Sequence, residues 1–149
     1  MKKEKEKKYL IEVNERQLRL LSWACDRMAR IIEGQDHTYQ EFMEMAWEKR
    51  CKEATGESMD AVFEGGWYKM RSDAEEMCKN MKLRFWGLPN NASYGIRYDD
   101  AADTIWDIHR VLRHQLWKEN DNRSQITVDA ECPTTEIGSE PLITITRKE

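Results

Sequence analysis

Residues 99–119, DDAADTIWDIHRVLRHQLWKE, combine two aspartates suited to capping a helix with strong helical periodicity. Apolar residues recur every three or four positions and would share one core-facing side of a helix. They are Ala101, Ile105, Ile108, Leu112 and Leu116. A second side carries two tryptophans around a histidine and an arginine, in the set Ala102, Trp106, His109, Arg113 and Trp117. We expect one continuous helix, whose second side either packs against another helix or subunit or contacts a stacking, phosphate-bearing ligand.

Three more helices are expected before this one. Asn14 followed by Gln17 is a capping-box signature, and it predicts a helix over residues 15–33. Periodic apolar residues predict a second helix that starts at residue 38 and ends before the glycine at position 56. The same pattern predicts a third helix over residues 67–85. The centre of the chain is therefore predicted to be mostly helical.

Segments that favour β-structure lie towards the two ends. Residues 9–13 and 142–147 alternate apolar and other side chains, and a shorter alternation occurs at residues 126–128. The pattern predicts an α+β fold, in which four helices pack on a small sheet of N- and C-terminal strands. Residues 1–8 are expected to be a disordered basic N-terminus, followed by a single domain over residues 9–149. The exposed edges of such a sheet, together with six tryptophans, predict a homo-oligomer.

The connection before the last helix, FWGLPNNASYGIRY at residues 85–98, gathers aromatic, amide, glycine and basic residues. Aromatic rings stack on bases, amides read base edges, arginines neutralise phosphate, and a helix start attracts anions. These properties predict a nucleotide-binding wall opposite the second side of the fourth helix. The candidate ligand-binding residues are Trp86, Asn91, Tyr94, Arg97, Tyr98, Trp106, His109 and Arg113. The alternative is an ordered connection whose aromatic side chains plug the core.

Acidic residues at the start of the fourth helix suggest a different chemistry. Asp100, Asp103 and Asp107 share one side of that helix, and carboxylates so placed can hold Mg²⁺. Three glutamates of the second helix repeat the spacing, as in the helical nucleotide pyrophosphatases, but the paired ExxE and ExxD motifs of that family are absent. A magnesium-dependent nucleotide hydrolase is therefore an alternative. No residue is assigned as a catalytic group or as a metal ligand.

Charge and composition argue against several classes of protein. A net charge of −4 does not suit general nucleic-acid coating, which needs a dominant positive field. No run approaches 18 apolar residues, so we expect no membrane span and a cytoplasmic location. The sequence shows no nucleophile motif and no glycine-rich phosphate loop, and its three histidines do not form a ligand set. We therefore lean towards a protein that is not an enzyme and expect no cofactor.

Several motifs resemble a family of small proteins from bacteriophages and mobile elements of gut bacteria. The resemblance lies in KYLIEVNERQLRLL near the start, NASYGI at residues 91–96, YDDAADTIWDIHRVLRHQLWKEN at residues 98–120 and EPLITI near the end. The layout is also loosely similar to viral sponge proteins of the Thoeris anti-defence type. Those proteins are small oligomers that bind cyclic nucleotide signals without cleaving them, through aromatic stacking and contacts from arginine and asparagine.

This resemblance implies a phage accessory protein that binds and sequesters a nucleotide-type immune signal in the cytoplasm of the bacterial host. The residue pattern alone leaves two other functions open. One is the magnesium-dependent hydrolase, and the other is an inhibitor whose tryptophan-bearing helix side binds a host protein.

Overall fold

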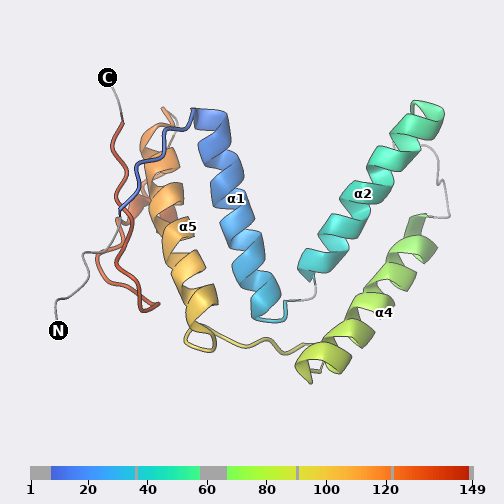
Figure 1. Ribbon diagram of the computed structural model, residues 1–149. Coiled ribbons are helices and arrows are strands. Elements are labelled where there is room, and N and C mark those ends of the chain that lie inside the picture. The colour runs from blue at the N-terminus through green and yellow to red at the C-terminus, as the bar shows by residue number, and fades with distance from the viewer. Residues whose placement is uncertain (1–7, 36, 58–66, 90, 122, 148–149) are drawn as a thin grey trace.

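The computed structural model describes residues 8–147, except residues 36, 58–66, 90 and 122 (Figure 1). This part of the chain forms four α-helices and one short 3-10 helix. Their bounds are α1 Glu15–Ile32, α2 His37–Thr55, α4 Trp67–Trp86, α5 Asp100–Lys118 and η1 Val128–Ala130. The four predicted helices are confirmed, including the capping box that starts α1. Residues 1–7, most of the segment predicted to be a disordered N-terminus, lie outside the described residues.

The predicted α+β fold is wrong, because the described residues contain no strand and no sheet. Residues 9–13 are extended but exposed, and Leu10 keeps 97% of its surface. Residues 142–147 are also irregular and show no backbone ladder with another described segment. Residues 126–128 lead into η1 instead of forming a strand. Alternating β-branched residues stabilise a strand only where a neighbouring strand supplies hydrogen bonds and packing, and that neighbour is missing here.

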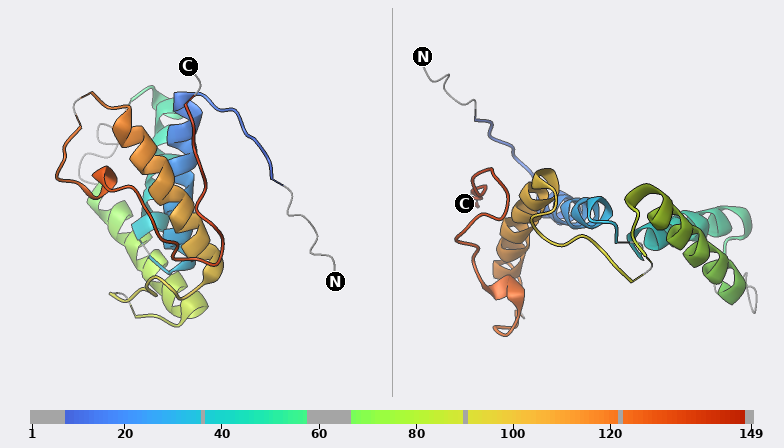
Figure 2. Two further views of the ribbon diagram at one scale, coloured as in Figure 1. Left: turned by 90° about the vertical axis from the view of Figure 1, so that its left-hand side faces the viewer. Right: turned by 90° about the horizontal axis from the view of Figure 1, so that it is seen from below.

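The helices form two antiparallel pairs, α1 with α5 and α2 with α4 (Figure 1). The two pairs lie side by side, and α1 and α2 diverge from their shared end (Figures 1 and 2). Contact between α1 and α2 occurs near that end. The rings of Trp23 and Phe42 meet edge to face with centroids 5.8 Å apart, and Arg27 pairs with Glu41 at 2.8 Å. Each pair of helices therefore packs mainly within itself.

Small side chains let α1 and α5 approach closely. Ala29 of α1 and Ala102 of α5 are 0% and 1% exposed, and Ser22 of α1 is buried beside His109 of α5. By contrast, Ala101, expected on the core-facing side, is exposed. The second side of α5 thus packs against another helix, which is one of the two outcomes expected for it.

Hydrogen bonds between the end of α1 and the segment after α4 hold the base of the fold together. The indole Nε1 of Trp86 donates to the carbonyl oxygen of Ile32 at 3.1 Å. The backbone N–H of Tyr94 donates to the carbonyl oxygen of Glu33 at 2.9 Å. Gly34 turns the chain at this point with a φ of 76°, and a Cβ there would lie 3.2 Å from the Trp86 ring. These bonds use carbonyl groups that the end of α1 leaves open, and they join the two helix pairs.

Carboxylates of α5 hold the C-terminal segment along that helix. Asp107 accepts hydrogen bonds from the backbone N–H groups of Ile137 and Gly138 at 2.6 and 3.0 Å. Asp100 accepts from the N–H group and the hydroxyl of Ser139 at 2.7 and 2.6 Å. The segment after η1 is therefore fixed to α5 by hydrogen bonds to side chains of that helix at residues 137–139, just before the predicted strand at residues 142–147.

Replacing Gly138 with alanine tests this anchor. A Cβ at Gly138 would lie 2.6 Å from the backbone nitrogen of Thr104, so the segment must move away from α5. We expect Gly138→Ala to lower the free energy of unfolding by about 1–3 kcal/mol in urea denaturation. Gly95→Ala is the matched control, because nothing lies within 4 Å of its Cβ, and it should change stability by less than about 1 kcal/mol. Equal stability of the two variants would contradict the described anchor.

Candidate functional site

Aromatic side chains of the connection between α4 and α5 contact one another. The rings of Tyr94 and Tyr98 are stacked, with centroids 3.6 Å apart and planes inclined by 3°. The hydroxyl of Tyr94 donates to the backbone oxygen of Trp86 at 2.9 Å, and the Trp86 ring lies 5.8 Å from that of Tyr39 in α2. Trp86 and Tyr94 therefore belong to the base of the fold, whereas Tyr98 remains 52% exposed.

Two polar candidates of the same connection lie at the surface. Asn91 and Arg97 are both exposed. Arg97 has a φ of 71°, which is uncommon for a residue with a side chain, and its backbone N–H donates to Oδ1 of Asp103 at 2.8 Å. This bond fixes the turn that leads into α5. The side chains of Asn91 and Arg97 stay open to solvent.

Two arginines from different helices flank Trp106 of α5. The guanidinium carbon of Arg30 in α1 lies 5.5 Å from the Trp106 ring, and that of Arg113 in α5 lies 5.9 Å from it. Both distances fall in the range of cation–π contacts. Arg113 also pairs at 3.3 Å with Asp129 of η1, whose side chain is 43% exposed. The arrangement brings two guanidinium groups and an indole together at the junction of α1 and α5, and we call these three residues the Trp106 cluster.

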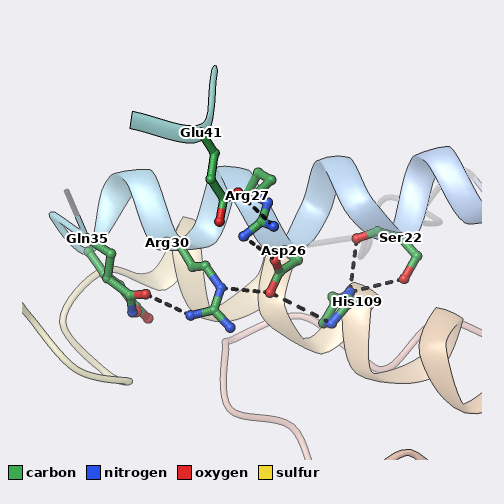
Figure 3. A network of polar contacts seen from close by, with 8 residues as sticks. Ser22, Asp26, Arg27, Arg30, Gln35, Glu41 and His109 are labelled. Atoms are coloured by element: carbon green, nitrogen blue, oxygen red, sulfur yellow. Dashed lines mark hydrogen bonds and ion pairs between the residues drawn. The ribbon is translucent and has the colours of Figure 1, made fainter. Parts of the chain in front are cut away.

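A chain of polar contacts runs along α1 next to this cluster (Figure 3). Nδ1 of His109 lies 2.9 Å from the carbonyl oxygen of Ser22, and the proton of the neutral ring is therefore assigned to Nδ1. Nε2 of His109 lies 4.0 Å from Oδ1 of Asp26, which also accepts a hydrogen bond from Arg30 at 2.9 Å. Arg30 in turn donates to Gln35 at 2.8 Å. These contacts hold the Arg30 side chain in place from two sides.

The structure places the eight candidate residues in two neighbouring groups. The base of the fold contains Trp86, Asn91, Tyr94, Arg97 and Tyr98, and α5 carries Trp106, His109 and Arg113. Contacts through α1 link the groups. The backbone oxygen of Glu33 accepts from Tyr94 and its side chain accepts from Gln35. Gln35 in turn accepts from Arg30, which lies over Trp106. The nucleotide-binding role of these residues stays a prediction.

Sequence reasoning missed Arg30, Asp26 and Asp129 as neighbours of the candidate site. Arg30 and Asp26 lie on α1, and their contacts with α5 form only when the two helices pair. A signal was nevertheless present, because Ser22, Asp26 and Arg30 follow one another at spacings of four and so mark a polar side of that helix. No comparable signal marks Asp129, which reaches Arg113 only through the fold.

Burial shifts the pKa values of two ionisable groups near the site. Burial is the main reason that the pKa of Glu33 is raised, and the neighbouring carboxylate of Asp103 raises it further, against the effects of Gln35 and Arg30. Burial also lowers the pKa of His109, although its hydrogen bond to Ser22 and the charge of Asp26 favour the protonated ring. Neutral His109 is thus the form that suits the packed α1–α5 pair.

The aspartates considered for a magnesium site have structural partners. Asp103 accepts from the backbone N–H of Arg97, and Asp100 and Asp107 bind the C-terminal segment as described above. Asp107 also accepts from the Arg110 guanidinium at 2.7 Å. No group of three or more acidic, histidine or cysteine residues suited to a metal ion occurs within the part of the chain that the structure describes.

The tryptophan-bearing side of α5, considered for binding a host protein, is largely engaged within the chain. Trp117 donates through Nε1 to the backbone oxygen of Ser124 at 2.8 Å, and its ring is stacked with His114 at 5.7 Å between centroids. The guanidinium of Arg123 lies 5.2 Å from the Trp117 ring. Because Trp106 lies against Arg30 and Arg113, both tryptophans of that side have intramolecular partners.

Comparisons with known proteins give no family to which the chain can be assigned. No protein-family description, curated protein or solved structure matches the chain. Among the described residues, no helix has the length and apolar character needed to cross a lipid bilayer.

Tyr94 provides a test of the aromatic base. Tyr94→Ala removes the stack on Tyr98 and the hydrogen bond to Trp86, so we expect a loss of about 2–3 kcal/mol in the free energy of unfolding. Tyr9→Ala makes the same chemical change at a residue that is 83% exposed, and it should cost less than about 0.5 kcal/mol. Thermal or urea melts of both variants measure the difference. A Tyr94→Ala protein as stable as Tyr9→Ala would show that the tyrosine pair does not hold the base.

His109 makes stability depend on pH. Because its pKa in the folded protein is lowered, the unfolded chain binds the proton more readily, and acid favours unfolding. The stabilising contribution should be complete above about pH 6.5, the ordinary value for histidine, and should decline as the pH falls below it. We expect His109→Gln, which keeps a donor for Ser22, to weaken this pH dependence between neutral and mildly acidic conditions. A His109 ring that titrates above the ordinary value in NMR would contradict the assignment.

Proposed function

We propose that this protein binds a nucleotide-type small molecule without changing it chemically, at the Trp106 cluster of Arg30, Trp106 and Arg113. The observation that carries the proposal is the placement of two guanidinium groups within 6 Å of one indole ring, at 5.5 and 5.9 Å. Guanidinium groups match phosphate geometry and indoles present a flat apolar face, so the cluster combines the two contacts that a nucleotide needs.

The ion pair between Arg113 and Asp129 supports the binding of a phosphate group at this position. Its N–O distance is 3.3 Å, and the Asp129 side chain is 43% exposed. The Arg113 side chain is 24% exposed, so the pair is partly open to solvent. Solvent screening and the ordering of two side chains limit what such a pair contributes to stability. A phosphate carries more charge than the carboxylate and can replace Asp129 beside Arg113 at low energetic cost. Arg30, held by Asp26 and Gln35, is already oriented at the same ring.

The stacked tyrosines of the connection between α4 and α5 add a surface for a base. Tyr98 is half exposed while Tyr94 anchors it to the base of the fold. An aromatic stack contributes roughly 1–3 kcal/mol per base in proteins that bind single-stranded nucleic acids. The exposed amide of Asn91 and the guanidinium of Arg97 lie on the same connection, where they would contact the edge or sugar-phosphate part of the ligand.

A hydrolytic step is not part of the proposal. Asp100, Asp103 and Asp107, the carboxylates that a magnesium-dependent hydrolase would use, already bind backbone N–H groups. Drawing them to a metal ion would release the C-terminal segment and the turn before α5. Binding a ligand without cleaving it leaves all of these hydrogen bonds in place.

The resemblance to phage and mobile-element proteins extends the proposal to a biological setting. In that setting the protein acts in the cytoplasm of a bacterial host as a homo-oligomer and sequesters a nucleotide immune signal. Mass spectrometry of small molecules released from the purified protein by heat tests this directly. Release of an intact nucleotide supports sequestration, whereas release of its hydrolysis product on incubation with Mg²⁺ would contradict it.

Arg113→Ala should weaken nucleotide binding about tenfold to a hundredfold, the value of one charge-assisted contact of about 1.5–3 kcal/mol. Titration calorimetry with a panel of cyclic and linear nucleotides measures the affinity. Arg123→Ala is the matched control, since Arg123 also lies over a tryptophan, Trp117, and among the described residues no second arginine lies over that ring. Equal affinities of the two variants, or an unchanged melting temperature of the wild-type protein with every nucleotide, would overturn the proposal.

A further inference from the structure

The chain on its own exposes more surface than a compact protein of its size. Its accessible surface is 11694 Å², whereas a compact monomer of 17.8 kDa exposes about 8,000 Å². Among the described residues, the buried apolar ones are small or few: Ala29, Cys51, Cys78, Ala102 and Leu112. Several large apolar side chains on the helices keep more than half of their surface exposed, among them Leu20, Met45, Met77 and Leu83. The isolated chain therefore has apolar surface available for an interface.

One side of α4 combines exposed apolar residues with charges of both signs. Cys78 and Lys82 are buried, at 1% and 2% exposure, and they mark the inner side of α4. Residues two positions away from them lie on the opposite, outer side. That outer side contains Asp73, Glu76, Met77, Asn80, Leu83 and Arg84, and we call it the outer α4 face. Met77 and Leu83 at its two edges keep 56% and 60% of their surface.

Charges on the outer α4 face are arranged symmetrically about Asn80. Glu76 lies four residues before Asn80 and Arg84 lies four residues after it, which is about 6 Å along the helix in each direction. Within the described part of the chain, neither Glu76 nor Arg84 has an ion-pair partner, although both are exposed. When one of two copies is turned end to end, the acidic half of its face therefore lies opposite the basic half of the other copy.

We propose that two copies of this chain pair through their outer α4 faces, antiparallel and across a two-fold axis at Asn80. In that arrangement Glu76 lies level with Arg84 of the partner subunit, and the reverse pair forms on the other side of the axis. The two Asn80 amides meet at the axis, where each can donate to and accept from the other. Met77 and Leu83 become covered at the edges of the contact.

The occupant is a second copy because the charges of the face are complementary to those of the same face on another copy. A face that pairs with itself must obey two-fold symmetry. The order Glu76, Asn80, Arg84 along α4 meets this condition, because reversing one copy places acid opposite base. A buried asparagine at such an axis also fixes the register of the two helices.

Charge reversal tests the pairing. Wild-type protein at micromolar concentration should have twice the 17.8 kDa mass of the chain in light scattering coupled to gel filtration. Glu76→Arg and Arg84→Glu should each weaken the dimer at least about tenfold, since each places like charges opposite one another twice. The double variant E76R/R84E restores opposite charges and should recover the dimer. Arg16→Glu, at an exposed position of α1, is the matched control and should leave the mass unchanged.

Circular-dichroism melts of all variants confirm that they are folded before the masses are compared. Each measured mass then supports or overturns the proposal. A monomeric wild-type protein would overturn it, as would a dimer that both single variants preserve or a double variant that stays monomeric. These substitutions leave Arg30, Trp106 and Arg113 in place. Loss of the dimer and loss of nucleotide binding are therefore separate outcomes, and failure of one proposal does not imply failure of the other.

Discussion

The pair of hydrogen bonds at the base of the fold, from Trp86 to Ile32 and from Tyr94 to Glu33, is the constraint on which the remaining structure depends. The two helix pairs touch each other at few other points, so these bonds set how the pairs are joined. They also decide where the connection after α4 runs, and therefore where α5 begins. The spacing between Tyr98, Arg97 and the Trp106 cluster follows from that starting point.

Local signals in the sequence were sufficient for the helices and insufficient for the fold class. Asn14 with Gln17 and Asp99 each cap a helix in the way their spacing indicates, because capping involves only residues close in the chain. The segment at residues 142–147 has a strand pattern of equal quality. A strand requires a neighbouring strand, which is often far away in the sequence, and no described segment forms a backbone ladder with residues 142–147.

Within the candidate site, the placement of residues on a single helix could also be predicted from the sequence, whereas contacts between distant segments could not. Trp106, His109 and Arg113 could be placed on one side of a helix from their spacing, and α5 does present that side to α1. Arg30 could not be assigned to the site, because its contact with Trp106 depends on how α1 and α5 pair. The sequence leaves open whether residues 85–98 form a binding site or a structural connection. In the structure Trp86 and Tyr94 make structural contacts. Asn91, Arg97 and Tyr98 remain accessible.

The pairing of the first helix with the last has a consequence for how the chain folds. Since α1 and α5 are separated by residues 33–99, bringing them together closes a long loop, and the entropy lost grows with the logarithm of loop length. The α2–α4 hairpin closes a much shorter loop and draws the two ends of the long one towards each other. We infer that the hairpin and the base form early and that α5 docks on α1 late. During synthesis α1 leaves the ribosome well before α5, so the side of α1 that packs on α5 stays uncovered until α5 has also emerged.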